Sequence, residues 1–230
     1  MKKMIFSKRI EMLSIGPLVD DDTLKSRIQD CIRYQDFITT IAPNLHQVET
    51  AVQQLKDTDI NVCAEIAFPL GNLPLEVKRI QIESAIKSGA ARVEIMMPIE
   101  YLKIEDFKMA EKETAFLCSI PADQGVAVTL IANLCMLDRN QKLYAAEIAI
   151  KNKASFRTAS GFGVETNLPD IKLIRDEFAE DIHLAACGNI QLAQSALDYI
   201  GMGADVICTS EPVNLIHGLE ILKQHGYQEA

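Results

Sequence analysis

Short apolar runs alternate with stretches of helical periodicity along the whole chain. Eight of these runs are typical of buried strands, because they are short and often apolar on both faces. They lie at 11–15, 37–41, 62–68, 92–97, 126–131, 182–186 and 205–208, with one more that begins at Ser155. A segment with apolar residues at helical spacing follows each run.

This order of elements, with strands roughly 25 to 30 residues apart, predicts an α/β fold of the (β/α)8 class, a TIM barrel. A doubly wound open sheet fits the same alternation, but no G-x-G-x-x-G sequence follows an early strand. No linker, low-complexity tract or block of charge divides the chain. We therefore expect residues 1–230 to form a single TIM-barrel domain.

Composition narrows the range of partners. The 230 residues are 48% hydrophobic and 24% charged, and the formal net charge is −9. Nucleic-acid surfaces need clustered lysine and arginine, so we expect no nucleic-acid partner. An anionic substrate would have to be held by a local site, because the overall field repels it.

Cysteine and histidine are both scattered. The six cysteines form no C-x-x-C pair, which predicts free thiols in a reducing compartment, the cytoplasm. The four histidines lie far apart in the sequence, so we expect no metal and no cofactor. The first ten residues lack the apolar core of a signal peptide, and no run approaches the length of a membrane span.

One guanidinium interrupts an otherwise apolar strand, and the turn after it is rich in small residues. Arg157 would cost several kcal/mol in such a strand unless a carboxylate or a ligand neutralised it. Glu94 is the only oppositely charged residue that we predict inside a strand, so the two could form an inert ion pair or a ligand site. Ser160 and Gly161 begin a turn whose amides could hold an anion.

In a barrel of this kind, functional residues lie where the strands end. Besides Arg157 and Glu94, the predicted strand ends contribute Phe68, Asn133, Cys187, Gly188, Asn189 and Ser210. The loops after the last two strands usually bind phosphate, and Gly188 and Asn189 suit that task. Glu211 and Pro212 do not, because a carboxylate occupies the positive helix end and proline removes an N–H donor.

Several motifs occur in a fixed order along almost the whole chain. They are LVDDDT at 18–23, FPLG at 68–71, EVK at 76–78, GAARVE at 89–94, EIA at 147–149, RTASGF at 157–162 and GAD at 203–205. In this order they resemble the deoxyribose-phosphate aldolases. The resemblance implies a TIM barrel that cleaves 2-deoxyribose 5-phosphate to acetaldehyde and glyceraldehyde 3-phosphate through a Schiff base on a strand lysine. It also implies a possible homodimer.

The chain departs from this family at the reacting groups. The resemblance places the Schiff-base lysine at Arg157, its partner lysine at Ala185, a third interior lysine at Thr129 and the proton-relay aspartate at Glu94. Arginine stays protonated and cannot act as an amine nucleophile. We therefore expect an inactive or repurposed protein that binds a small sugar phosphate or carboxylate through Arg157 and the turn after it. The alternatives are an aldolase or lyase that uses another residue, and a non-catalytic partner subunit.

Overall fold

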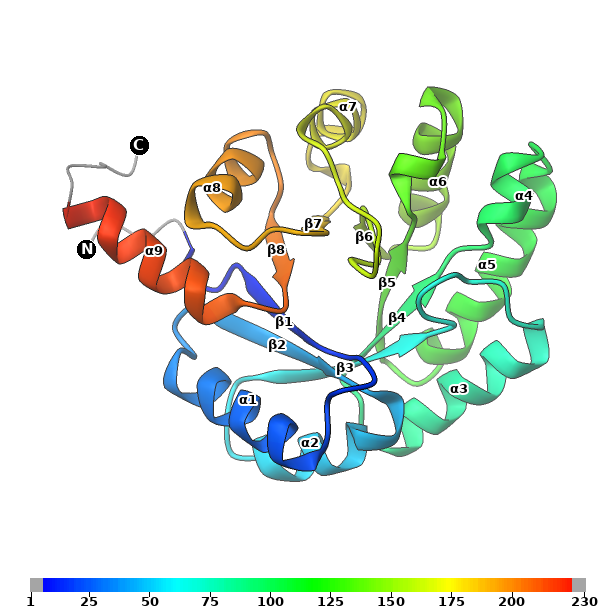
Figure 1. Ribbon diagram of the computed structural model, residues 1–230. Coiled ribbons are helices and arrows are strands. Elements are labelled where there is room, and N and C mark those ends of the chain that lie inside the picture. Colours follow the sequence, from blue (N-terminus) through cyan, green and yellow to red (C-terminus); the bar gives the residue numbers. More distant parts are fainter. Residues whose placement is uncertain (1–5, 225–230) are drawn as a thin grey trace.

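Eight parallel strands close into a barrel in the computed structural model, which describes residues 6–224 (Figure 1). Each strand pairs with the next in the chain, and β8 pairs with β1. The strands are β1 (Ile10–Ser14), β2 (Ile38–Pro43), β3 (Asn61–Ile66), β4 (Arg92–Met96), β5 (Ala127–Ile131), β6 (Ser155–Arg157), β7 (Leu184–Cys187) and β8 (Val206–Thr209). All eight predicted strands are confirmed, and closure of the sheet excludes the doubly wound alternative.

Helices surround the strands on the outside (Figure 1). They are α1 (Asp21–Arg33), α2 (Val48–Leu55), α3 (Leu75–Lys87), α4 (Ile99–Lys103), α5 (Phe107–Ala122), α6 (Arg139–Lys151), α7 (Leu168–Phe178), α8 (Ala193–Gly201) and α9 (Pro212–Gln224). The sequence pattern did not predict α4, because five residues are too few to display a helical period.

Local capping chemistry fixes where helices begin. Asp20 precedes α1 and its carboxylate accepts a hydrogen bond from the amide of Thr23 at 2.8 Å. Asp138 and Gln141 form a reciprocal capping box at the start of α6. Such caps fix the point where a loop ends and its helix begins, and so they help to position the loops at the barrel mouth.

The barrel buries charged as well as apolar side chains. Apolar side chains such as Leu24, Ile41 and Phe156 are fully buried in the main core. In contrast, Glu65, Glu94 and Arg157 are at most 4% exposed and lie on strands. Buried charges need partners, so their contacts decide how this barrel is stabilised.

Candidate functional site

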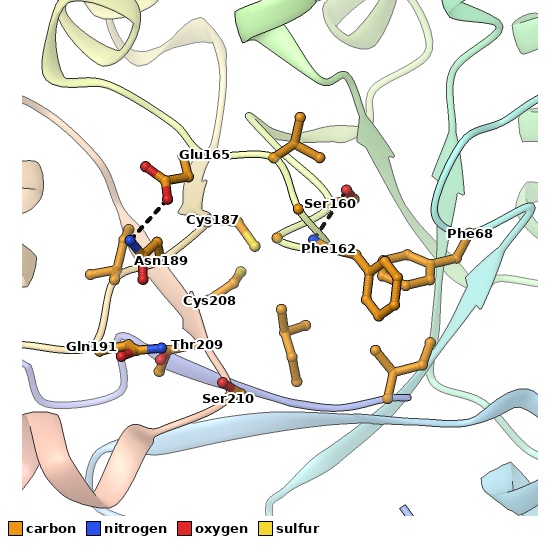
Figure 2. A pocket seen from close by; sticks show the side chains of 17 residues that line it. Phe68, Ser160, Phe162, Glu165, Cys187, Asn189, Gln191, Cys208, Thr209 and Ser210 are labelled. Carbon is orange, nitrogen blue, oxygen red and sulfur yellow. Dashed lines mark hydrogen bonds between the residues drawn. The ribbon is translucent and has the colours of Figure 1, made fainter. Parts of the chain in front are cut away.

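A cavity of about 390 Å³ opens where β6, β7 and β8 end (Figure 2). It is lined by six of the residues that the sequence predicted for ligand binding, namely Phe68, Ser160, Gly161, Gly188, Asn189 and Ser210. Loops that are far apart in the sequence meet here because parallel strands point their carboxyl ends toward one mouth. The structure therefore brings the predicted loop residues together in one pocket.

The turn that follows β6 is held in place by Asn133 at the end of β5. The amide of Ser160 donates to Oδ1 of Asn133 at 2.8 Å, and Nδ2 of Asn133 donates to the carbonyl of Pro69 at 3.4 Å. The amide of Phe162 donates to the Ser160 hydroxyl at 3.4 Å. Gly161 has φ +80°, a conformation that glycine tolerates best. Two amides of this turn are thus used internally, which leaves fewer donors for an anion.

The loop after β7 packs directly against the chain that leaves β6. A Cβ built on Gly188 would lie 2.7 Å from the Cα of Glu165 and 2.7 Å from the carbonyl oxygen of Val164. Nδ2 of Asn189 donates to Oε1 of Glu165 at 2.9 Å, a bond drawn in Figure 2. This bond joins two loops of the pocket wall, and it places one carboxylate beside the cavity.

The loop after β8 satisfies its own helix end. The amide of Glu211 donates to the Thr209 hydroxyl at 3.0 Å, and Nδ2 of Asn214 donates to the Glu211 carboxylate at 3.2 Å. A carboxylate at this position takes the favourable place of an anion near the start of α9. Ser210 is exposed, and its side chain remains beside the cavity.

Arg157 is fully buried on β6 and lines neither of the two cavities at the barrel mouth. Its guanidinium contacts Glu65, with Nη1 2.8 Å from Oε1 and Nη2 donating to Oε2 at 3.0 Å. Nη1 also donates to Glu94, and Nε donates to the carbonyl of Ala159 at 3.2 Å. The structure thus shows the ion pair with Glu94 and adds a second carboxylate.

The expectation that Glu94 is the only carboxylate for a strand cation was wrong. Arg92 on β4 pairs with Glu11 at 2.7 Å and with Glu94 at 2.6 Å. Three carboxylates and two guanidiniums therefore form one network across the barrel: Glu11, Arg92, Glu94, Arg157 and Glu65. Barrel closure brings together β1, β3, β4 and β6, and no local sequence pattern shows which of their side chains will meet.

The two carboxylates around Arg157 differ in acidity. Burial raises the pKa of Glu65 to about 7, and the attraction of Arg157 only partly offsets this. Burial also acts against ionisation of Glu94, but Arg157 and Arg92 hold the pKa of Glu94 below its ordinary value. When Glu65 carries a proton, the network holds two cations and two anions and is electrically neutral.

Glu65 could have been found by the argument that identified Arg157, since both are charged residues inside a strongly apolar strand. It is 4% exposed and lines a second cavity of about 580 Å³ over the ends of β1, β2 and β3. The rings of Phe68 and Phe162 meet edge to face, with centroids 5.9 Å apart, and line both cavities. This aromatic pair is visible in Figure 2.

Lysines lie on the outside of the barrel in the part of the chain that the structure describes. They occur in helices or in loops before a strand, and neither the strands nor the loops after them contain one. Lys78, the most buried lysine, pairs with Glu113 of α5 at 2.7 Å. Arg157 is in register with Ala185 of β7, and Glu94 with Thr129 of β5. The positions that the resemblance assigns to reacting groups are therefore neighbours, but none of them carries an amine.

Across residues 6–224, no helix has both the length and the apolar character that a bilayer crossing requires. The same residues contain no group of three histidine, cysteine or acidic side chains arranged to hold a metal ion.

Comparisons with known proteins give a consistent result. The deoxyribose-phosphate aldolase of Clostridium perfringens is 30% identical over 220 residues, which covers 95% of this chain and 97% of that protein. The deoxyribose-phosphate aldolase of Thermococcus kodakarensis is 28% identical over 222 residues, covering 95% and 98%. No protein-family model matches the sequence.

Solved structures share the fold. The chain superimposes on the deoxyribose phosphate aldolase from Aeropyrum pernix, described as a unique tetrameric structure, with a TM-score of 0.86 and 17% identity. That match covers 94% of this chain and 92% of the other. An aldolase named QR15 matches with a TM-score of 0.85 and 24% identity over 96% and 97% of the two chains.

Proposed function

The chain belongs to the deoxyribose-phosphate aldolase family, and from this premise we propose that it is a non-catalytic member that binds a small sugar phosphate or carboxylate. The cavity over β6, β7 and β8 would be the binding site. The observation that carries the proposal is the buried guanidinium of Arg157, which two carboxylates hold where the family resemblance implies a reactive lysine.

The chemistry of the reaction supports this proposal. Schiff-base formation needs a nitrogen with a free lone pair, so a lysine must lose its proton near neutral pH. The charge of the Arg157 guanidinium is delocalised and the group stays protonated. Its N–H groups already donate hydrogen bonds to Glu65, Glu94 and the carbonyl of Ala159. No lysine among residues 6–224 lines either cavity at the barrel mouth, so none of these residues is placed to supply the same chemistry there.

The catalytic half of the proposal is tested with 2-deoxyribose 5-phosphate. We expect no release of acetaldehyde, and no lysine adduct after incubation with acetaldehyde and borohydride. The deoxyribose-phosphate aldolase of Clostridium perfringens serves as the positive control in both assays. Turnover above background, or a borohydride-stable adduct on any lysine, would show that an aldolase with a different nucleophile is the correct alternative.

The binding half rests on the polar groups that remain beside the cavity. The Ser210 hydroxyl and the turn at Gly188 and Asn189 line the cavity and are available to bind a ligand. The loop after Ser210 offers less, because the Glu211 amide already donates to Thr209 and the Glu211 carboxylate lies at the start of α9. Glyceraldehyde 3-phosphate, 2-deoxyribose 5-phosphate and simple carboxylates should each be tried in a thermal-shift titration. A ligand at 100 times its Kd stabilises the fold by about 2.7 kcal/mol, which such a titration detects easily.

A matched pair of variants localises the binding. Ser210→Ala removes an exposed hydroxyl beside the cavity, whereas Ser84→Ala removes an exposed hydroxyl from α3, far from it. We expect Ser210→Ala to weaken the thermal shift and Ser84→Ala to leave it unchanged. If no compound shifts the melting temperature of the parent protein, the binding proposal fails even though the catalytic half stands.

Self-association and cytoplasmic location complete the proposal. Four apolar side chains on or just before α3 are exposed: Leu73 at 37%, Leu75 at 40%, Val77 at 39% and Ile80 at 52%. We propose that they lie between copies in a homodimer, and light scattering would measure the mass in solution.

The six cysteines are free thiols, which suits the reducing cytoplasm.

A further inference from the structure

Two cysteines lie side by side in the floor of the cavity. Cys187 is the last residue of β7 and is in register with Cys208 of β8, and both line the cavity. Figure 2 shows their sulfur atoms pointing toward one another at its centre. Register partners on neighbouring strands are about 4.7–4.9 Å apart, which falls within the Cα separations that disulfides span, about 4.4–6.8 Å.

The surroundings of the pair differ from those of the other cysteines. The Sγ–H of Cys208 donates to Oε2 of Glu11 at 3.3 Å, so a carboxylate is in place to accept its proton. Cys187 lies under Gly161, where an added Cβ would be 3.0 Å from its Sγ. Cys31, Cys63 and Cys118 are buried and do not line the cavity, although Cys63 also contacts a carboxylate, that of Glu94, whereas Cys135 is exposed.

From this geometry we propose that Cys187 and Cys208 form an oxidisable dithiol, a modification site that a small peroxide entering the cavity converts to a disulfide between β7 and β8. The proposal does not depend on the identity of the ligand or on the absence of aldolase activity.

The chemistry takes place in two steps. Cys187 attacks one oxygen of the peroxide, the O–O bond breaks, and a sulfenic acid and water form. Cys208 then attacks the sulfenic sulfur, its proton passes to Glu11, and the leaving hydroxide takes up that proton as water. In total, two thiols are oxidised by two electrons, and one hydrogen peroxide is reduced to two waters.

The pair should react more slowly than an exposed thiol. The hydrogen bond with Cys187, and after it burial, raises the pKa of Cys208, and both residues are at most 1% exposed. The thiolate is the reactive form, and a thiol with a raised pKa forms little of it. Disulfide formation therefore depends on the closeness of the two sulfurs and not on high reactivity of either thiol. The exposed Cys135 provides an internal reference for this comparison.

The test treats the whole protein with hydrogen peroxide and then alkylates it in denaturant. In a Cys135→Ser background we expect a mass lower by two hydrogens before alkylation, two fewer alkylated thiols per chain after it, and a linked peptide pair containing Cys187 and Cys208. A thiol reductant should reverse all three changes. Cys187→Ser and Cys208→Ser should each abolish the linked pair, and Cys118→Ser should leave it unchanged.

Two results would overturn the proposal. In one, both thiols are still alkylated after peroxide treatment has been continued for many times the period that oxidises the exposed Cys135 of the parent protein completely. In the other, Cys187 or Cys208 accumulates as sulfinic acid without a linked peptide, because neighbouring sulfurs within reach would trap the sulfenic acid first. Circular dichroism of each variant checks that a lost link does not reflect a lost fold.

Discussion

The buried carboxyl of Glu65 should make this barrel less stable at neutral pH than at mildly acidic pH. Its pKa rises from an ordinary value of 4.5 to about 7 in the folded state, chiefly through burial. A folded pKa above the unfolded one means that the native state binds the proton more tightly. The stabilisation is therefore complete below pH 4.5 and is lost as pH rises through 7.

The size of the effect follows from the same shift. Each pKa unit corresponds to about 1.4 kcal/mol, so full ionisation of Glu65 should lower the unfolding free energy by about 3 kcal/mol. The charged groups that face it are Arg157 of β6, which favours ionisation, and Glu94 of β4, which opposes it. Replacing Glu65 with glutamine keeps the shape and removes the titration.

Urea unfolding at intervals from pH 4.5 to 8.5 tests this reasoning. We expect the difference in stability between the parent protein and Glu65→Gln to change by about 3 kcal/mol over this range, in favour of the variant at high pH. Glu49→Gln, at an exposed position on α2, is the control and should follow the parent. Parallel curves for the parent and Glu65→Gln would refute the reasoning.

Three other substitutions test the network and the loops. Arg157→Met should lower the unfolding free energy by about 3–5 kcal/mol in urea titrations, because it leaves buried Glu65 without a cationic partner and leaves Glu94 with Arg92 alone; an unchanged midpoint would contradict the network. Arg157→Lys should yield no borohydride-trapped adduct with acetaldehyde, since the same two carboxylates would keep the new amine protonated; a trapped adduct would show otherwise. Gly188→Ala should lower Tm by several degrees, because its Cβ would meet backbone atoms at 2.7 Å, whereas Gly201→Ala, with open space around it, should not; equal melting temperatures would count against the tight loop contact.

Several features of the candidate site could be predicted from the sequence. Small residues after the last strands led to the prediction that Gly188 and Ser210 lie at one site, and both line the same cavity because strand ends in a barrel meet at one mouth. The self-capping of the loop at Glu211 was also predictable, since it depends only on residues adjacent in the chain.

The alternation of apolar runs and helical periods determined the order of strands and helices by itself, because buried parallel strands and amphipathic helices each impose a period on neighbouring residues. Closure of the sheet, which only the tertiary structure shows, decided between the barrel and the doubly wound fold. The same local pattern showed that Arg157 needed a partner. Only the tertiary structure decided which partners it has, since Glu65 and Glu94 come from strands far away in the sequence. Barrel closure and strand register set those distances, and with them the network of buried charges, the raised pKa of Glu65 and the pairing of Cys187 with Cys208.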